Sequence, residues 1–296
     1  MLTDVQCMLK EGNTMHIYNY VGKGRKGMKK LKAIIAVSLI GVMALAICGC
    51  SCSTSGGNTA VKNDENTFVV GFDAEFPPYG FKDESGNYTG FDLDLASAVA
   101  NKLGMKVAYQ PIDWDAKDAE LKSGTIDCIW NGFTINGRED QYEWSEPYLD
   151  NKQVVVVKAD SPIQSNADLA GKNVEVQKES SAETALSEGA GAALKATFGN
   201  LTTVADYNTA LMDLESGATN AVIMDSGVAE YKIKSESKAF RLLPEAIASE
   251  QYGVGFAKGN TALRDKVNKA LHELVADGSM EQITNKWFGS NIVIIK

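Results

Sequence analysis

The chain has 296 residues, of which 29 are Lys or Arg and 38 are Asp or Glu, so its formal net charge at pH 7 is −9. A protein this acidic lacks the basic surface that neutralises phosphates, which excludes a nucleic-acid partner. The roughly 230 residues that follow residue 65 are enough for two lobes with cores of their own.

The N-terminal segment has the pattern of a secretory signal. Lys29, Lys30 and Lys32 precede an apolar run over residues 33–47, so residues 1–49 are expected to be a signal peptide. The run is rich in Ala and Gly and too short for a helix across a bilayer core, which takes about 20 residues. Residues 1–27 show no periodicity and are expected not to belong to the working protein. Either the true start lies at Met28 or the basic segment before the apolar run is unusually long.

Cys50 is the expected lipidation site. Gly49 stands directly before it and Cys48 and Cys52 flank it, a pattern that resembles the lipobox of bacterial lipoproteins. The alternative is an ordinary signal with an incidental cysteine. Residues 50–65 are expected to form a flexible, lipidated tether, since residues 51–58 are rich in Ser, Thr and Gly. Beyond residue 49 the chain carries 22 basic and 36 acidic residues, a net charge of −14, which suits a body that its tether holds off an anionic membrane.

The first elements beyond the tether alternate between strands and helices. Strands are predicted over residues 68–72, 107–111 and 126–130, and helices over residues 91–103 and 115–123. The first helix follows from Phe91, Leu95, Val99 and Leu103, which recur at every fourth position before Gly104. The order βαβαβ predicts a parallel sheet.

The pattern then restarts after a β-branched run at residues 154–157. Strands are predicted at 174–176 and 220–224, helices at 180–196 and 208–216, and a strand at 253–256 that returns to the first lobe before two terminal helices. The segment 121–130, with its Leu-x-Ser-Gly step and apolar strand, is echoed 93 residues later by 214–223. The glycine of each step is expected to end a helix in a left-handed conformation.

Two lobes are therefore expected, the first from residues 66–152 and 248–296 and the second from residues 153–247. The carboxyl ends of parallel strands are where ligands bind in open α/β sheets, so the two strand exits predict a cleft between the lobes.

Few residues in the body suit catalysis or metal binding. His272 is the sole histidine beyond the signal segment, and Cys128 the sole cysteine beyond the anchor region. Cys128 lies in a predicted apolar strand and is expected to be a buried hydrophobe. His272 lies between Leu271 and Glu273 in a predicted terminal helix and is expected to be solvated, which does not suit a Ser-His-Asp arrangement, and a single histidine cannot form a two-His metal motif. No catalytic residue, metal or cofactor is expected.

Five motifs resemble the solute-binding lipoproteins of ABC importers for polar amino acids. The resemblance runs from Thr67 to Gly289, and the motifs lie at residues 71–78, 90–95, 129–135, 144–148 and 286–289. It implies a two-lobed α/β fold of the type II periplasmic-binding-protein class, in which each lobe is a mostly parallel sheet flanked by helices and two crossover hinge strands join the lobes. The implied protein is a monomer that closes over a free polar L-amino acid. It would sit lipid-anchored on the outer face of the cytoplasmic membrane of a Gram-positive cell, with a permease and its ATPase subunit as partners.

The resemblance also implies how the ligand's backbone groups are held. Arg138 matches the arginine that binds the α-carboxylate, although three residues separate it from Thr134 where the family usually has four. A guanidinium suits this role because it can donate two parallel charge-assisted bonds. Asp225 matches the aspartate that accepts from the ammonium. The remaining positions implied for the backbone groups of the ligand are the Gly132 carbonyl, the Thr134 hydroxyl, Asn131 and Ser181.

The side-chain pocket is implied at Asp73, Phe76, Trp114 and Gln177. Two aromatic rings can enclose an aliphatic stem or a guanidinium, and Asp73 can accept from a polar tip. The implied ligand is a cationic or glutamine-like amino acid, and cystine is an open alternative. A cyclohexadienyl dehydratase-like enzyme on the same fold is a further alternative, which the pairing of Arg138 with Asp225 disfavours. Residues 180–183, Ser-Ser-Ala-Glu, also read as a capping box.

Overall fold

The computed structural model describes residues 7–11, 14–18 and 66–296. Of the predicted signal peptide at 1–49, residues 7–11 and 14–18 are described, whereas its apolar run at 33–47, Cys50 and the tether at 50–65 lie outside the described residues. The chain divides into two units, residues 1–57 and 58–296. In the first, β1 (Cys7–Glu11) pairs antiparallel with β2 (Thr14–Tyr18), where the sequence predicted no regular element. Ile17 and Tyr18 belong to residue types that favour extended backbone.

The first sheet of the larger unit has the strand order β7-β3-β8-β16-β9. Its strands are β3 (Thr67–Phe72), β7 (Lys106–Pro111), β8 (Cys128–Ile129), β9 (Glu143–Trp144) and β16 (Gly255–Phe256). The pairs β3–β7 and β3–β8 are parallel, whereas β16 runs antiparallel to β8 and β9. The prediction of a mostly parallel sheet is therefore corrected to a mixed sheet, because β16 enters from the opposite end as the chain returns.

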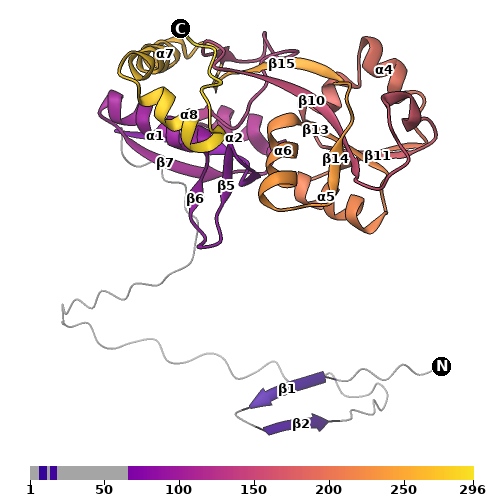
Figure 1. Cartoon of the computed structure of the whole chain (residues 1–296). Coiled ribbons are helices and arrows are strands. Elements are labelled where there is room, and N and C mark those ends of the chain that lie inside the picture. Colours follow the sequence, from indigo (N-terminus) through magenta and orange to yellow (C-terminus); the bar gives the residue numbers. More distant parts are fainter. Residues whose placement is uncertain (1–6, 12–13, 19–65) are drawn as a thin grey trace, which may run out of the picture. The chain divides into compact units, whose positions relative to one another are not determined.

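Helices cover the first sheet (Figure 1). They are α1 (Phe91–Leu103), α2 (Lys117–Ser123), α7 (Thr261–Ala276) and α8 (Ser279–Phe288), with a short 3₁₀ turn at Trp114–Ala116 before α2. The stripe of α1 is buried as expected, with Phe91, Leu95 and Val99 fully covered. A small sheet of β4 (Glu75–Phe76), β5 (Gly80–Lys82) and β6 (Tyr88–Thr89) precedes α1.

The second sheet has the strand order β12-β11-β13-β10-β14, with β15 also paired to β10. Its strands are β10 (Leu149–Lys158), β11 (Asn173–Gln177), β12 (Asn200–Val204), β13 (Ala221–Asp225), β14 (Phe240–Leu242) and β15 (Ala248–Tyr252). Only β11 pairs in parallel, with β12 and β13. This sheet is mixed as well, since β10, β14 and β15 pair antiparallel.

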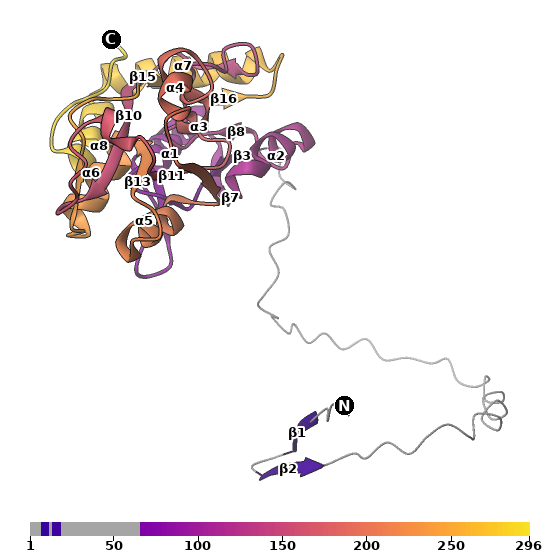
Figure 2. The same cartoon turned by 90° about the vertical axis from the view of Figure 1, so that its right-hand side faces the viewer.

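The helices of the second lobe are α3 (Ser181–Ala185), α4 (Gly189–Lys195), α5 (Tyr207–Ser216) and α6 (Ser226–Ser235), together with a 3₁₀ turn at Asn166–Leu169. The single helix predicted over residues 180–196 is two helices. The break falls at residues 186–188, and α4 begins at Gly189, whose φ of 51° is left-handed, a conformation that glycine adopts readily. Figure 2 views the molecule from the side of this lobe.

The repeated Leu-x-Ser-Gly step has the predicted geometry. Gly124 ends α2 with a φ of 75°, and Gly217 ends α5 with a φ of 85°. Each is followed by a buried strand, β8 or β13. Cys128 is a free, fully buried cysteine, as expected.

Strands β10 and β15 of the second sheet extend from it toward the first lobe (Figure 1). Leu149 pairs with Tyr252 at one end of their ladder and Gln153 with Ala248 at the other. Beyond this ladder β10 pairs with β13, and the chain after β15 leads into β16 of the first sheet. No helix in the described part of the chain combines the length and apolarity needed to cross a membrane.

Candidate functional site

A cavity lies where the exits of β8 and β13 face each other. Its lining residues are Phe76, Trp114, Gly132, Thr134 and Arg138 from the first lobe, and Gln177, Ser180, Ser181 and Asp225 from the second. The sequence singled out all of these except Ser180. Asp73 and Asn131 were also singled out but do not line the cavity. Asn131 is buried, and its Oδ1 has no hydrogen-bond partner among the described residues.

The loop after β8 is held from behind by a buried carboxylate. Gly132 has a φ of 56°, and a Cβ there would stand 2.9 Å from the Phe76 ring, so only glycine fits. The Gly132 N–H donates to Asp92 Oδ2 at 2.5 Å, and the Tyr148 hydroxyl donates to Asp92 Oδ1 at 2.9 Å. Burial raises the pKa of Asp92 to about 7, although these hydrogen bonds favour the ionised form.

Thr134 offers a buried hydroxyl to the cavity. The residue is 2% exposed, and its Oγ1 has no hydrogen-bond partner among the described residues. A buried hydroxyl without a partner loses about 1–3 kcal/mol of solvation. Its place in the lining suits it to bind a polar group in the cavity.

Arg138 brings a buried positive charge to the same cavity. The residue is 6% exposed, its Nη2 donates to the Glu179 carbonyl at 2.9 Å, and its Nη1 donates to the Thr134 carbonyl at 3.4 Å. The guanidinium carbon also lies 5.3 Å from the centre of the Phe133 ring. Burial lowers the pKa of Arg138, but a guanidinium stays charged in proteins. Because both acceptors are neutral carbonyls, the charge is available to an anion.

Asp225 stands on the opposite wall, at the end of β13. It is 2% exposed, and its Oδ1 accepts from Asn151 Nδ2 at 2.9 Å and from the Tyr252 hydroxyl at 2.6 Å. Glu250, also buried, accepts from the same Asn151 Nδ2 at 2.7 Å and from Gln153 Nε2 at 2.8 Å. Burial, followed by the charge of Glu250, raises the pKa of Asp225 well above its usual value.

The four residues around the Asp225 carboxyl group, which include its neighbour Glu250, were not identified from the sequence. Asn151 and Gln153 lie on β10, and Glu250 and Tyr252 on β15. In the structure the burial of β10 alternates at its start and places Asn151 and Gln153 inside while Asp150 and Lys152 face out. In the sequence residues 150–153 are all polar, so no apolar alternation marks the buried face. Polar residues on the buried face of a strand require hydrogen-bond partners there.

Asp73 lies behind the lining and fixes Gln177. Its Oδ2 accepts from Gln177 Nε2 at 2.7 Å across the lobes, and its Oδ1 accepts from the Glu75 N–H at 2.8 Å. Burial raises the pKa of Asp73 to about 6. Trp114 lines the cavity and packs edge-on against Phe133, with ring centres 5.4 Å apart.

The turn into α3 differs from the predicted capping box. Ser180 Oγ accepts from the Glu183 N–H at 3.2 Å as expected. The Glu183 carboxylate, however, accepts from the Glu179 N–H at 2.6 Å instead of from Ser180. The cause lies in Glu179, whose left-handed φ of 57° redirects its N–H. Ser181 Oγ accepts from Gln153 Nε2 at 2.8 Å.

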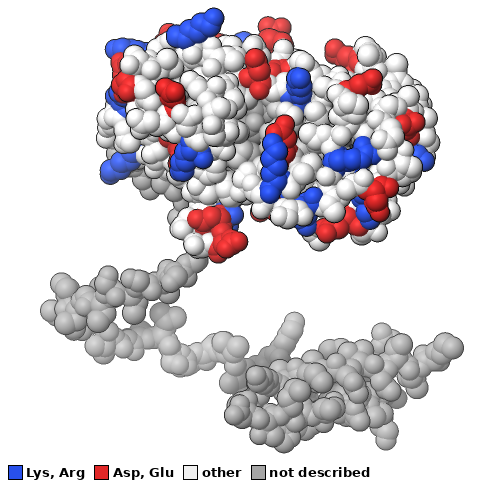
Figure 3. Space-filling model, in the orientation of Figure 1, with Lys and Arg blue, Asp and Glu red and all other residues white. Residues whose placement is uncertain are grey.

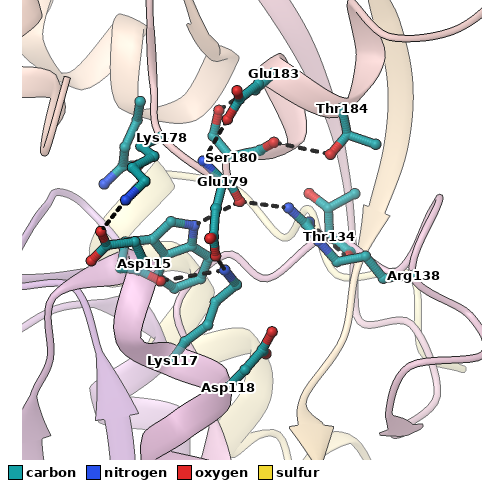
Figure 4. A network of polar contacts seen from close by, with 12 residues as sticks. Asp115, Lys117, Asp118, Thr134, Arg138, Lys178, Glu179, Ser180, Glu183 and Thr184 are labelled. Carbon is teal, nitrogen blue, oxygen red and sulfur yellow. Dashed lines mark hydrogen bonds and ion pairs between the residues drawn. The ribbon is translucent and has the colours of Figure 1, made fainter. Parts of the chain in front are cut away.

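The two lobes are in contact around the cavity. Figure 4 shows Lys117 Nζ, 2.9 Å from Glu179 Oε2, and Lys178 Nζ, 2.7 Å from Asp115 Oδ2. Acidic and basic side chains are interspersed on the face drawn in Figure 3. No group of three or more His, Cys, Asp or Glu side chains within residues 66–296 is arranged to hold a metal ion.

A cavity between two α/β lobes, with a buried guanidinium on one wall and a buried carboxyl on the other, is the arrangement expected of a solute-binding protein. The chain belongs to the bacterial extracellular solute-binding proteins, family 3, whose model matches residues 68–290. The predicted family, the two-lobed fold and the assignment as a binding protein in place of an enzyme are thereby confirmed.

Named relatives bind several amino acids. The chain is 30% identical to the L-cystine-binding protein TcyJ of Escherichia coli over 269 residues, which cover 89% of this chain and 99% of that protein. It is 31% identical to the arginine-binding extracellular protein ArtP of Bacillus subtilis over 265 residues, 88% and 98% of the two chains.

Solved structures agree with these relatives. The substrate-binding protein of an ABC uptake transporter from Streptococcus pneumoniae with bound histidine superposes with a TM-score of 0.75 at 36% identity, over 78% of this chain and 95% of that one. An ancestral arginine-binding protein bound to glutamine superposes with a TM-score of 0.71 at 38% identity, over 77% and 100%.

Proposed function

We propose that this protein captures a polar L-amino acid, cationic or glutamine-like, between its lobes and delivers it to the permease of an ABC importer. The observation that carries the proposal is that Arg138 and Asp225, both more than nine-tenths buried, line one cavity from opposite lobes. An amino acid presents an α-carboxylate and an α-ammonium that match this arrangement. Arg138 would bind the carboxylate and Asp225 the ammonium.

The remaining lining residues fit the other parts of such a ligand. The unpartnered Thr134 hydroxyl and the Gly132 carbonyl would accept from the ammonium, while Ser181 stands near the carboxylate end. Asn131, buried directly before Gly132, would support this loop. Phe76 and Trp114 would enclose the side chain, and Gln177 would face it with Asp73 behind. The names of the relatives support a polar side chain, since they include arginine, histidine and glutamine.

Cystine is the second candidate, favoured by the E. coli relative that binds it. Its second α-ammonium would face Gln177, with Asp73 behind, in the position where a cationic side chain would otherwise sit. The two candidates therefore use the same residues and differ in the ligand group that stands near Gln177 and Asp73.

We further propose that Cys50 is lipidated and anchors the protein to the outer face of the cytoplasmic membrane, with the ATPase subunit of the importer on the inner side. The support is the sequence around Gly49-Cys50 and the Ser-, Thr- and Gly-rich tether that follows. Family membership itself places the protein outside the cytoplasm.

A thermal-shift screen against the twenty amino acids, ornithine and cystine tests the proposed function. A ligand at about 100 times its Kd stabilises the folded state by about 2.7 kcal/mol, which is a clear rise in Tm. Arginine, lysine, histidine, glutamine or cystine should give the largest rise. If only apolar amino acids shift the Tm, the assigned ligand class is wrong.

A further inference from the structure

Glu179 is one of two residues other than glycine with a positive φ among the described residues; the second is Ser237. It lies between β11 and α3, and its φ of 57° is a conformation that a long side chain rarely adopts. Such a backbone persists only where the surroundings over-determine it, and it often marks a functional position.

All the polar groups of Glu179 have partners, and three of these partners belong to the first lobe. Its carbonyl accepts from Arg138 Nη2 at 2.9 Å and from Trp114 Nε1 at 3.3 Å, and its Oε2 accepts from Lys117 Nζ at 2.9 Å. Within its own lobe its N–H donates to Glu183 at 2.6 Å. Figure 4 shows Glu179 at the centre of this network. Two of its three partners in the first lobe, Arg138 and Trp114, line the cavity, whereas Glu179 itself does not.

The ion pair with Lys117 differs from its neighbour, Lys178–Asp115. The Lys117 side chain is 4% exposed and that of Glu179 46%. The Lys117 ammonium also donates to the Trp114 carbonyl and lies 5.3 Å from the Trp114 ring centre. In the Lys178–Asp115 pair both side chains are well exposed, at 53% and 40%. Exposed ion pairs contribute little to the stability of the folded state. Removing the partner of a buried ammonium, in contrast, leaves an uncompensated charge, which is strongly destabilising.

We propose that Glu179 is a positioning residue of the ligand cleft. From the second lobe, its carbonyl fixes the guanidinium of Arg138 and the indole of Trp114, and its carboxylate secures this arrangement by neutralising Lys117 as the lobes close. The ligand affinity then depends on an ion pair that never touches the ligand. This inference rests on the proposed amino-acid-binding function.

The test measures ligand affinity and stability separately in the full chain. Calorimetry with L-arginine, L-histidine, L-glutamine and L-cystine identifies the ligand of the wild type, and the Tm without ligand reports on the fold. Glu179→Gln, which removes only the charge, and Lys117→Met should each weaken binding about tenfold or more. The double variant should bind about as well as the weaker single variant, because both changes break the same pair.

Glu179→Gly separates a positioning role from a purely structural one. Glycine adopts a φ of 57° without strain, so the Tm without ligand should be no lower than that of Glu179→Gln, which loses the same charge but keeps the strain, while binding weakens about tenfold. Ser237→Gly is the matched backbone control, because Ser237 has a φ of 53° and lies in the exposed loop between α6 and β14. It should bind as the wild type does.

Lys178→Met is the matched charge control, and it should change the Kd by less than about twofold. The inference is overturned if Glu179→Gly or Glu179→Gln binds within about twofold of the wild type, or if Lys178→Met weakens binding as much as Glu179→Gln does. If the wild type binds none of the four amino acids, the proposed function fails, and the inference fails with it.

Discussion

Asp225 and Glu250 accept hydrogen bonds from the same amide nitrogen, Asn151 Nδ2, at 2.9 and 2.7 Å. Both residues are buried, and the hydrogen bond of Gln153 to Glu250 joins the pair to Ser181 at the cavity. Two carboxyl groups this close resist ionising together, which together with burial raises the pKa of Asp225. A ligand ammonium beside Asp225 has the opposite effect and favours the ionised form.

Ligand binding should therefore release a proton, and Glu250→Gln should reduce that release. Without the negative charge of Glu250 one of the two causes that raise the pKa of Asp225 is removed, so a smaller fraction of Asp225 carries a proton before the ligand arrives. Calorimetry at pH 7 in phosphate and in Tris gives the number of protons, up to about one for the wild type and fewer for the variant. Equal proton release in the two proteins would show that the pair does not couple to the ligand.

Removing either charged wall residue should abolish strong binding while leaving the fold intact. Arg138→Ala and Asp225→Ala each leave a ligand charge buried without its partner, at about 2–5 kcal/mol, which is about 30- to 3000-fold in Kd. Arg241→Ala is the control, because Arg241 bonds to the Ser161 carbonyl away from the cavity. A loss of less than about fivefold in calorimetry for either wall variant would mean that its role is misassigned.

Asp92 should make the folded protein less stable as the pH rises. Its pKa is about 7 in the folded chain, whereas the ordinary pKa of an aspartate is 3.8. Between about pH 4 and 7 the folded chain therefore keeps a proton that the unfolded chain has lost, so the free energy of unfolding falls with rising pH, by at most about 1.4 kcal/mol per pH unit. Urea unfolding of the wild type and Asp92→Asn from pH 4 to 8 measures this contribution as a difference.

Asp94→Asn serves as the control, since Asp94 lies on the same helix and pairs with Lys286 at the surface. The difference in the free energy of unfolding between Asp94→Asn and the wild type should change less from pH 4 to 8. A wild-type advantage over Asp92→Asn that grows as the pH rises would contradict the assignment.

Cys50→Ala should free the protein from the membrane. Acyl chains on Cys50 are the proposed anchor, and stable anchoring depends on such chains where no spanning segment remains after cleavage. Fractionation of cells that express the wild type and the variant measures the change, with Cys52→Ala as the matched control that stays bound. A cleaved variant that still sediments with membranes would refute lipidation at Cys50.

Much of the fold follows from local patterns. The helix predicted over residues 91–103 is α1 (Phe91–Leu103), and the first strand is off by one residue. These succeed because an amphipathic stripe and a glycine cap act over a few residues. The direction of β10 and β16 was missed, because strand direction depends on where the chain returns from a distant segment and leaves no local trace.

The site was predicted unevenly for a similar reason. Residues at strand exits, such as Thr134 and Asp225, follow from motif and topology. Glu250 comes near Asp225 only through the pairing of β15 with β10, which no local pattern announces. Glu179 was missed because no composition or spacing rule places a glutamate in the left-handed region.

The last prediction concerns selectivity. Asp73 accepts from Gln177 Nε2 at 2.7 Å and has a pKa of about 6, so it is mostly ionised at pH 7. If it faces a cationic ligand tip, Asp73→Asn should weaken the binding of L-arginine by about tenfold or more relative to that of L-glutamine, because only the cation loses a charge–charge interaction.

The ratio of the two Kd values, for L-arginine and L-glutamine, cancels effects on the shared α-carboxylate and α-ammonium sites, including titration of Asp225. In the wild type this ratio should shift against arginine as the pH falls from 7 to 5, and in Asp73→Asn it should stay flat. A ratio that neither the substitution nor pH changes would remove Asp73 from the side-chain pocket.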